Sequence, residues 1–544
     1  MTWRNLAFNM DTLAHLEVER VALQQECDSA RTQRERNRLG QFATPPALAL
    51  EIMKYAKKLI PVHEKVSFLD PAFGTGSFFS ALLETFKPSR VTAAAGFEID
   101  RHYADKARDL WRENRLDLRT ADFTMGQPPR EIDKCNLLVC NPPYVRHHHL
   151  TAHDKTRLRS LTHSLCGLRL SGLSGLYCYF LLLSDAWVSD GGVSIWLVPS
   201  EFLDVNYGVP LKEYLLTKVN LVRIHRFDSQ NVQFGDALVS SSIVCFRKSS
   251  PLKDHLVDFT FGGSLSDPKL LQRIPLADLS PNSKWNERNW HTSASVPTTR
   301  LSDIFDVKRG LATGDNAFFI LTREQIKRHR LPMKFFKPIL PSPRFLSTDE
   351  IHGDKEGIPV LERQLFLLDC RLPEGVVQRD YPRLWKYLEQ GKYNDVAKGY
   401  LCSSRTPWYS QEYRPAPLFL CTYMGRSNRK KNVAALRFIL NHTKATAANV
   451  YLLLYPRIEL GRALLAKPQL KKEIWTWLNA ISPDVILSEG RVYGGGLHKI
   501  EPRELGNVPA DGIEKLLNIT IKKKSVQLNF FTSEQNPLKH AVGT

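Results

Sequence analysis

The chain has 544 residues, of which 43% are hydrophobic and 24% are charged. Both fractions are typical of folded globular proteins and exclude disorder or a coiled coil as the main architecture. The length exceeds that of one ordinary domain and predicts about two or three compact units. The net charge is +19, from 75 Lys and Arg against 56 Asp and Glu. This excess favours a polyanionic partner that is held through phosphate contacts.

Charge alone leaves DNA, RNA and acidic membranes open as partners. We favour a nucleic acid, because the basic residues are spread along the chain and form no polybasic tail or anchor. The N-terminus lacks the pattern of a signal peptide, and the longest apolar run is too short to span a bilayer. The nine cysteines include no CxxC pair, so the pattern indicates neither a zinc site nor a disulfide framework. We therefore expect a cytoplasmic protein with reduced, mostly buried thiols and no metal.

In chain order, residues 1–40 come first, and their apolar positions at helical spacing predict an exposed helical arm that ends in a basic stretch. From 41 to 250, short β-rich runs alternate with helical stretches, which is typical of a doubly wound α/β domain with a largely parallel sheet. Strands are expected at 66–69, 91–97, 137–140, 193–198 and 221–227, with helices such as 48–59 and 177–189. Residues 251–300 are rich in Ser, Pro, Asp and Lys and indicate a connecting region. Residues 301–544 form a second body without a clean βαβ rhythm.

The strongest local signal is the run FLDPAFGTGSF at residues 68–78, in which a strand leads through a turn into a helix. Gly74 and Gly76 let the backbone approach a ligand at the carboxyl edge of the sheet. A dinucleotide site would require a third glycine at position 79, where the chain has Phe79, and this argues against NAD. About one βα unit later, Glu98 ends a strand in GFEID and can accept both ribose hydroxyls of a nucleoside.

Two further strand ends carry chemistry. Asp122 and Phe123 offer an acceptor and an aromatic ring that suit an adenine. The next strand stops at NPPY, residues 141–144, where consecutive prolines hold the Asn141 side chain and the Pro142 carbonyl rigidly. Two fixed acceptors favour a pyramidal exocyclic amine whose lone pair can attack a sulfonium methyl group, with no covalent intermediate. Tyr144 would then stack on a base rotated out of the duplex.

The ordered set QFATPP (41–46), DPAFGTGSF, GFEID, ADF and NPPY resembles the gamma-class, TaqI-like N6-adenine DNA methyltransferases of restriction-modification systems. The resemblance implies a Rossmann-like class I methyltransferase domain at 41–250, S-adenosylmethionine as cofactor and a C-terminal α+β target-recognition domain at 301–544 that binds double-stranded DNA. It implies a cofactor site made of Thr44, Asp70, Ala72, Phe73, Gly74, Gly76, Glu98, Asp122 and Phe123. It also implies a catalytic set of Asn141, Pro142, Pro143 and Tyr144, with Phe234 against the flipped base.

The second body resembles the family more loosely, through glycine turns flanked by Arg and Lys at residues 307–316 and 491–499. Such turns let backbone amides and cations approach phosphates, although ordinary turns have the same composition. The three histidines at 147–149 point in different directions and have no carboxylate at ligand spacing, so we expect a surface loop rather than a metal site.

Several alternatives stay open. NPPY also occurs in enzymes that methylate protein glutamine, RNA bases or cytosine N4, and a DNA-binding protein without catalysis could keep the scaffold. The TPP segment and the large basic second body favour DNA, and the intact NPPY favours catalysis. No PD-(D/E)xK pattern of a fused nuclease is evident, so we expect a cognate restriction endonuclease to be a separate chain, and the methyltransferase to be a monomer.

Overall fold

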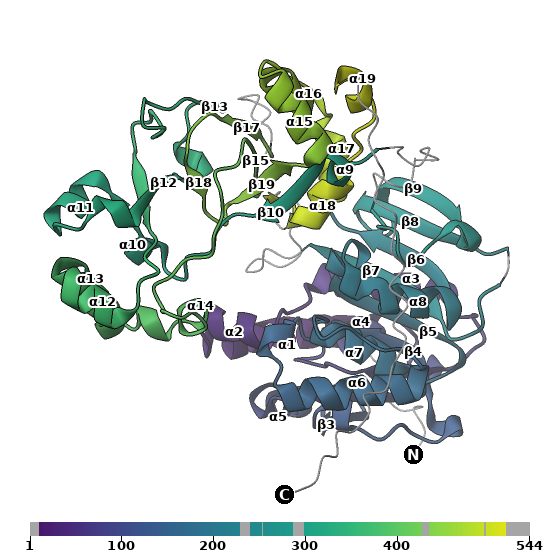
Figure 1. Cartoon of the computed structure of the whole chain (residues 1–544). Helices are drawn as coiled ribbons and strands as arrows, with labels where there is room; N and C mark the ends of the chain where they lie inside the picture. Colours follow the sequence, from purple (N-terminus) through teal and green to yellow (C-terminus); the bar gives the residue numbers. More distant parts are fainter. Residues whose placement is uncertain are drawn as a thin grey trace, which may run out of the picture. The chain divides into compact units, whose positions relative to one another are not determined.

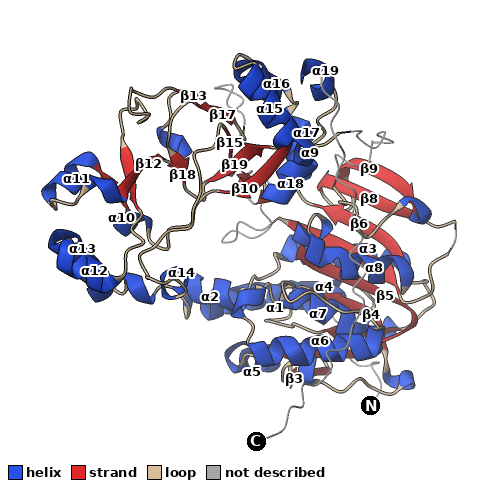
Figure 2. Cartoon of the chain, viewed as in Figure 1, coloured by secondary structure: helices blue, strands red, loops and turns tan. Residues whose placement is uncertain are grey.

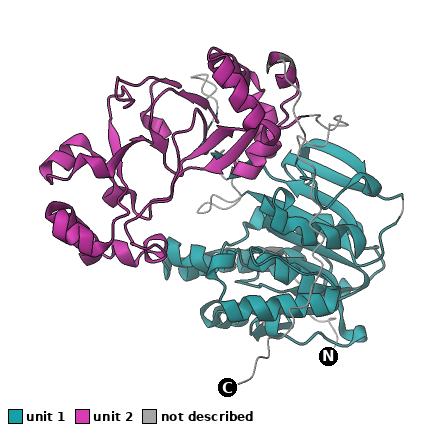
Figure 3. Ribbon diagram, viewed as in Figure 1, with its two compact units in different colours: residues 1–293, 425–435, 490–499 teal, residues 294–424, 436–489, 500–544 magenta. Residues whose placement is uncertain are grey.

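The computed structural model describes residues 10–228, 240–252, 254–286, 299–426, 435–493 and 497–517 (Figure 1). The chain divides into two compact units, coloured separately in Figure 3. Unit 1 comprises residues 1–293, 425–435 and 490–499, and unit 2 comprises residues 294–424, 436–489 and 500–544. Unit 1 thus includes two segments from the part of the chain that we assigned to the second body.

Unit 1 is built on a nine-stranded sheet in the order β3-β2-β1-β4-β5-β7-β6-β8-β9. Its strands are β1 (Val66–Asp70), β2 (Val91–Glu98), β3 (Leu116–Thr120), β4 (Cys135–Cys140), β5 (Val188–Pro199), β6 (Asn220–Arg226), β7 (Ser241–Arg247), β8 (Leu256–Gly263) and β9 (Pro268–Pro275). The five neighbouring strands β3, β2, β1, β4 and β5 are parallel to one another. Strand β7 lies antiparallel to both β5 and β6. The strand order reverses between β1 and β4, which opens a crevice at their carboxyl ends.

Helices cover both faces of this sheet (Figure 2). They are α1 (Met10–Ser29), α2 (Gln33–Leu39), α3 (Pro46–Leu59), α4 (Ser77–Thr85), α5 (Arg101–Trp111), α6 (Ala152–Cys166), α7 (Leu176–Leu183) and α8 (Val209–Thr217). Alternation along β4 separates two cores: Leu137 and Val139 pack with α3 and α4, whereas Leu138 and Cys140 pack with α6 and α7. The expected doubly wound α/β class is confirmed.

The N-terminal arm is more than an exposed helix. It consists of two helices, and α1 packs on α4 and α5. Arg20 and Cys27 of α1 are only 1% and 0% exposed. The expectation of a solvated arm is therefore wrong for one face of α1, because Leu13 and Leu16 pack against the core of unit 1 and Arg20 is enclosed by hydrogen bonds to Glu17 and Thr75.

Two expectations about secondary structure also need correction. The region 251–300 contains β8 and β9, which extend the sheet beyond β6. The residues of β9 alternate between half-buried and exposed, as expected at a sheet edge, and the strand has a proline at each end, which resembles a loop in the sequence. The helix expected at 177–189 ends at Leu183, and β5 begins at Val188.

Unit 2 holds a five-stranded sheet, β10-β19-β15-β17-β13, and a four-stranded sheet, β11-β14-β12-β18. The strands are β10 (Phe305–Arg309), β11 (Ile320–Thr322), β12 (Phe336–Leu340), β13 (Glu350–Ile351), β14 (Leu365–Leu368), β15 (Phe419–Thr422), β17 (Phe438–Asn441), β18 (Thr446–Ala447) and β19 (Tyr451–Pro456). The helices are α9 (Leu301–Ile304), α10 (Asn316–Phe319), α11 (Arg323–Arg328), α12 (Glu374–Asp380), α13 (Pro382–Tyr393), α14 (Tyr400–Ser403), α15 (Ile458–Ala466), α16 (Leu470–Ala480), α17 (Pro483–Glu489), α18 (Pro502–Asn507) and α19 (Ile513–Leu517). Most strand pairs are antiparallel, as in an α+β domain.

Three short strands lie near the changes of unit along the chain. They are β16 (Met424–Gly425), β20 (Arg491–Tyr493) and β21 (Leu497–Lys499). The last two pair antiparallel within unit 1. The glycine turn expected at 491–499 thus has strands on both sides, and its residues 494–496 lie outside the described part of the chain.

Among the described residues, no helix is both long enough and apolar enough to cross a bilayer. All nine cysteines are buried free thiols, as expected. In the same parts of the chain, no three His, Cys, Asp or Glu side chains gather as metal ligands would.

Candidate active site

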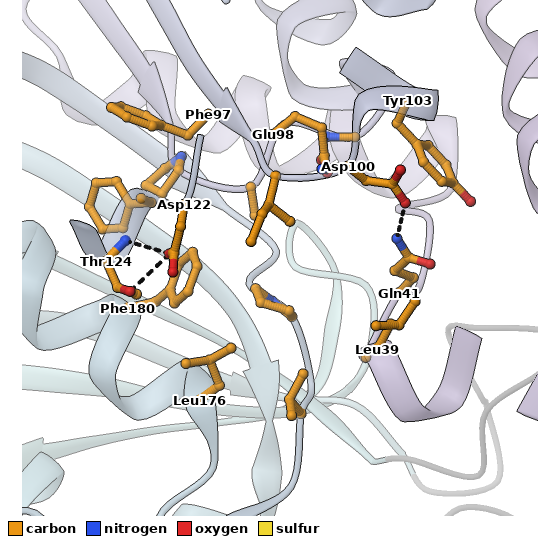
Figure 4. A pocket seen from close by; sticks show the side chains of 18 of the residues that line it. Leu39, Gln41, Phe97, Glu98, Asp100, Tyr103, Asp122, Thr124, Leu176 and Phe180 are labelled. Atoms are coloured by element: carbon orange, nitrogen blue, oxygen red, sulfur yellow. Dashed lines mark hydrogen bonds between the residues drawn. The ribbon is translucent and has the colours of Figure 1, made fainter. Parts of the chain in front are cut away.

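A cavity of about 590 Å³ opens in unit 1 at the carboxyl ends of β1, β2 and β4. This volume lies in the range of small-molecule sites. Figure 4 shows Asp122 and Thr124 on one side of the cavity, Gln41 and Asp100 on the other, and Glu98 between them. The cavity therefore lies where the reversal of strand order predicts a ligand.

The turn after β1 and the end of β2 form the middle of the cavity. Gly74 has a left-handed backbone with φ +57°, and a Cβ atom there would meet nothing within 4 Å. Its amide N–H donates to Glu98 Oε2 over 2.9 Å, and the Asp100 N–H donates to Glu98 Oε1 over 2.8 Å. Burial raises the pKa of Glu98 above its ordinary value, against these two hydrogen bonds. Each carboxylate oxygen keeps a second lone pair, so Glu98 can accept a pair of ligand hydroxyls.

One end of the cavity is aromatic and carries Asp122, whose carboxylate is oriented by hydrogen bonds. The backbone N–H and the hydroxyl of Thr124 both donate to Asp122 Oδ1, each over 2.8 Å. Arg157 of α6 in turn donates to the Thr124 carbonyl and hydroxyl oxygens, each over 3.0 Å. The rings of Phe123 and Phe180 lie 5.4 Å apart at this end. An acid with one oxygen fixed, set beside flat rings, suits the amino edge of a purine.

Asn141 lies at the end of β4 and lines the same cavity. Its Nδ2 donates to the Phe42 carbonyl oxygen over 2.8 Å and to Thr44 Oγ1 over 3.1 Å. Because a carbonyl oxygen can only accept, this contact fixes which end of the amide faces Phe42. Asn141 Oδ1 is buried, and no donor among the described residues bonds to it. A buried acceptor without a donor is costly, so this atom is poised for a donor from a ligand.

Tyr144 is held within the protein. It is 7% exposed, and its hydroxyl donates to the Leu197 carbonyl oxygen over 3.1 Å. Its ring lies 5.5 Å from that of Phe42, and its N–H donates to the Gly40 carbonyl oxygen over 3.0 Å. The ring does not line the cavity in this structure. Its stacking on a base stays a prediction.

The structure brings seven of the expected site residues to the cavity wall: Ala72, Gly74, Glu98, Asp122, Phe123, Asn141 and Pro143. Six others stand behind the wall: Thr44, Asp70, Phe73, Gly76, Pro142 and Tyr144. Phe234 lies outside the described residues.

Asp70, Phe73 and Gly76 do not line the cavity, but they pack in and under the turn that follows β1. The Phe73 ring packs so tightly that a Cβ on Gly96 would lie 2.4 Å from it and one on Gly76 would lie 2.8 Å from it. Asp70 is 1% exposed and accepts the Ala72 N–H over 3.1 Å. Burial raises the pKa of Asp70 to about 7. These side chains shape the turn and do not face the cavity.

The sequence did not reveal the part of the wall that the arm contributes. Gln24, Asp28 and Arg31 line the cavity together with Gln41. Arg31 pairs with Asp100 at 2.5 Å. A run of polar residues in a helix predicts a solvated face, and no local motif indicated that Gln24, Asp28 and Arg31 belong to a site.

The cavity fits S-adenosylmethionine. Asp122 and the rings beside it suit the adenine of the cofactor, and Glu98 suits its ribose. The open space beside Gly74 lets the methionine part of the cofactor approach the backbone. Asn141, whose Oδ1 has no donor among the residues that the structure describes, lies at the wall of the same cavity.

Comparisons with known proteins agree with this chemistry. Residues 92–233 match the family model described as Eco57I restriction-modification methylase. Residues 289–531 match the model described as Type II methyltransferase M.Eco57I, C-terminal domain.

Relatives match over most of the chain. The Type II methyltransferase M.AccI of Acinetobacter calcoaceticus is 26% identical over 490 residues, covering 86% of this chain and 85% of the relative. M.XamI of Xanthomonas campestris pv. amaranthicola is 26% identical over 490 residues, covering 88% and 86%. Among solved structures, the Type IIL restriction-modification enzyme MmeI in complex with DNA matches with a TM-score of 0.53 at 15% identity, over 82% of this chain and 67% of MmeI. The last likeness shows a shared fold.

Proposed function

We propose that the chain is a type II restriction-modification methyltransferase, as its family matches and relatives indicate, and that it transfers a methyl group from S-adenosylmethionine to N6 of an adenine in double-stranded DNA. The observation that carries the proposal is the fixed amide of Asn141, whose Oδ1 is buried and accepts from no described donor at the wall of a nucleoside-sized cavity.

The residues would share the work as follows. Asp122 would accept the amino group of the cofactor's adenine, and Glu98 would accept its ribose hydroxyls. S-adenosylmethionine would supply an electrophilic methyl group on a sulfonium, so that the nitrogen–carbon bond forms as the carbon–sulfur bond breaks, the thioether S-adenosylhomocysteine leaves, and the methylated amine loses one proton to water. Asn141 Oδ1 and the Pro142 carbonyl oxygen would accept the two hydrogens of the substrate amine and so favour a pyramidal nitrogen. This role is specific to the transition state, in which the nitrogen lone pair turns toward the methyl group.

The substrate base must leave the duplex to reach this wall, because an exocyclic amine in a base pair is not accessible to a buried amide. The gamma-class order of the motifs, with the cofactor residues before NPPY and a long C-terminal part after it, supports a DNA substrate that unit 2 recognises. The net charge of +19 supports phosphate contacts. We further propose that the enzyme acts as a cytoplasmic monomer and protects host DNA from a separate cognate endonuclease.

The test is transfer of a labelled methyl group from S-adenosylmethionine to genomic DNA of a methylation-free host, followed by nucleoside chromatography. We expect N6-methyladenine confined to one short sequence motif. Label in N4-methylcytosine, RNA or protein glutamine would contradict the proposed substrate. Cofactor binding without transfer to any of these would favour a DNA-binding protein without catalysis.

The matched variant is Asn141→Ala. We expect its methyl transfer to fall by about 10²–10³-fold, as for the loss of a transition-state hydrogen-bonding group. Its affinity for the cofactor should stay within about twofold, because Asn141 interacts with the substrate amine. Unchanged turnover would refute the assigned role.

A further inference from the structure

The N-terminal arm is fastened to the turn that follows β1. Arg20, which is 1% exposed, donates from Nη1 to Thr75 Oγ1 over 3.1 Å. The Thr75 hydroxyl donates to Gln24 Oε1 over 2.7 Å. The Thr75 carbonyl oxygen accepts the indole N–H of Trp111 over 2.9 Å. The arm and the turn are thus one hydrogen-bonded structure.

A second set of contacts joins the arm to α5. The Tyr103 hydroxyl donates to Asp28 Oδ1 over 2.8 Å, and Gln24 Nε2 donates to the same oxygen over 3.0 Å. The Arg31 guanidinium lies 5.8 Å from the centre of the Tyr103 ring. Burial, and then the hydrogen bond to Asp28, raise the pKa of Tyr103, so its hydroxyl stays a donor.

The third set lies beside the acid that we assign to the ribose. Asp100 Oδ2 receives Arg31 at 2.5 Å and Gln41 Nε2 at 3.2 Å, and Arg31 also donates to Gln41 Oε1 over 2.8 Å. The Asp100 N–H bonds to Glu98. The side chains of Arg31 and Asp100 are 25% and 14% exposed. Figure 4 shows Gln41 and Asp100 pointing toward one another at the cavity.

Loss of these three sets of contacts would affect the fold and the cavity differently. Arg20 is fully enclosed, so its removal would disturb the packing of α1. The triad of Arg31, Gln41 and Asp100 is polar and partly exposed, so its loss should disturb the fold less than the loss of Arg20. It nevertheless joins the end of the arm to the wall of the cavity at the ribose position. A contact of this kind can open and close while the fold stays intact.

We propose that Arg31, Gln41 and Asp100 form a clasp by which the N-terminal arm retains the cofactor in its cavity, so that release of S-adenosylmethionine or of its demethylated product requires the clasp to open. The clasp rests on the proposed function, since it assumes that an adenosyl cofactor occupies this cavity. Arg31 and Gln41 act as binding residues here, and the transfer chemistry remains with Asn141.

The test compares the full-length wild type with Arg31→Ala, Asp100→Asn and the double variant. Asp100→Asn preserves an oxygen that can accept the His102 N–H at the start of α5. The probes are S-adenosylmethionine and S-adenosylhomocysteine, with Kd measured by calorimetry and the dissociation rate by displacement. We expect each single variant to bind about tenfold more weakly through faster dissociation, and the double variant to be no weaker than the singles, because one contact is lost in each case.

The matched control is Arg34→Ala, which removes an exposed arginine of the same arm that does not line the cavity. Arg34→Ala should bind both probes like the wild type and should keep the kcat of the wild type. Unchanged Kd and dissociation rate in both single variants would overturn the clasp. The clasp would also be overturned if the variants that bind more weakly were destabilised without cofactor to the same extent, because the weaker binding would then reflect a disturbed fold. A wild type that binds neither probe would overturn the proposed function and the clasp with it.

Discussion

The side-chain amide of Asn141 donates to the backbone carbonyl oxygen of Phe42 over 2.8 Å. A residue at the end of β4 is thereby oriented by a segment that comes about 100 positions earlier in the chain, before the first strand of the sheet. The same amide nitrogen also bonds to Thr44 Oγ1. The segment before the sheet thus fixes the acceptor on which the proposed chemistry depends.

Thr44→Val should lower kcat about tenfold, because the isosteric methyl group removes one of the two acceptors that hold the Asn141 amide. Thr44 is 6% exposed and does not line the cavity, so the KM for the cofactor should stay close to that of the wild type. Steady-state kinetics at varied cofactor concentration separate the two effects. Thr44→Ser, which restores the hydroxyl, should recover most of the turnover. A Val variant that lost cofactor affinity and kept kcat would show that Thr44 contacts the cofactor, as the family resemblance implied.

The sequence predicted the part of the site that follows strand ends. Glu98 ends β2, and Gly74, Asp122 and Asn141 follow the ends of β1, β3 and β4, so the parallel strands bring all four positions to one edge of the sheet. Their local motifs therefore predicted where these residues lie, and the chemistry assigned to them stays a prediction. The aromatic partner at Phe234 stays a prediction, since it lies outside the described residues.

The sequence could not predict what tertiary packing adds. Arg31 reaches the cavity only because α1 folds back onto α4 and α5, and nothing in a run of Glu, Gln and Arg distinguishes such a helix from a solvated one. Strand β9 was missed because it is an edge strand with a proline at each end, within a region rich in Ser, Pro, Asp and Lys. The short strands of unit 2, such as β13 and β18, have too few residues to show a periodicity.

Asp122→Asn should weaken cofactor binding about 10- to 100-fold with little change of kcat at saturation. The Thr124 donors fix Asp122 Oδ1, so an asparagine would keep its oxygen there and turn its NH₂ group toward the cavity. A donor would then face the amino group of the adenine, and an unpaired buried polar group costs about 1–3 kcal/mol. Titration calorimetry measures the affinity.

A cofactor analogue sharpens this test. A donor analogue with a 6-oxo purine offers an acceptor in place of the amino group, so it should bind better to Asp122→Asn than to the wild type. The control is Asp117→Asn, which changes an exposed acid of β3 that pairs with Arg119. If Asp122→Asn showed the same preference between S-adenosylmethionine and the 6-oxo analogue as the wild type, Asp122 would not face the purine.

Gly40→Ala should impair both stability and methyl transfer. Gly40 ends α2 with φ +68°, and a Cβ there would lie 2.4 Å from the Tyr144 backbone nitrogen. The added methyl group must push the arm away from NPPY or break the hydrogen bond from the Tyr144 N–H to the Gly40 carbonyl oxygen. Gly167→Ala provides the control, since Gly167 ends α6 with φ +72° and has nothing within 4 Å of the added Cβ.

The control should therefore show only the backbone strain, about 1–2 kcal/mol, with unchanged kcat. Chemical denaturation and turnover measured side by side separate strain from displacement of the catalytic segment. Equal behaviour of the two alanine variants would mean that the contact between Gly40 and Tyr144 does not matter for catalysis.

His225 should make the protein lose stability in mild acid. The side chain lies fully buried on β6, where Nδ1 contacts Thr260 Oγ1 at 2.9 Å, and Nε2 has no partner among the described residues. Burial lowers the pKa of His225 from 6.5 to about 4. This effect outweighs Glu51, which raises the pKa, and Arg223 lowers the pKa further.

Above pH 6.5 the imidazole of His225 is neutral in both the folded and the unfolded state. As the pH falls from 6.5 to 4, the unfolded chain binds a proton that the folded protein excludes, so the free energy of unfolding falls. The loss at pH 4 is on the order of 3 kcal/mol. We expect His225→Gln, which does not titrate, to lose correspondingly less stability between pH 7 and pH 4 in urea unfolding, whatever its stability at pH 7. Parallel pH profiles for the variant and the wild type would rule out His225 as the source of the acid sensitivity.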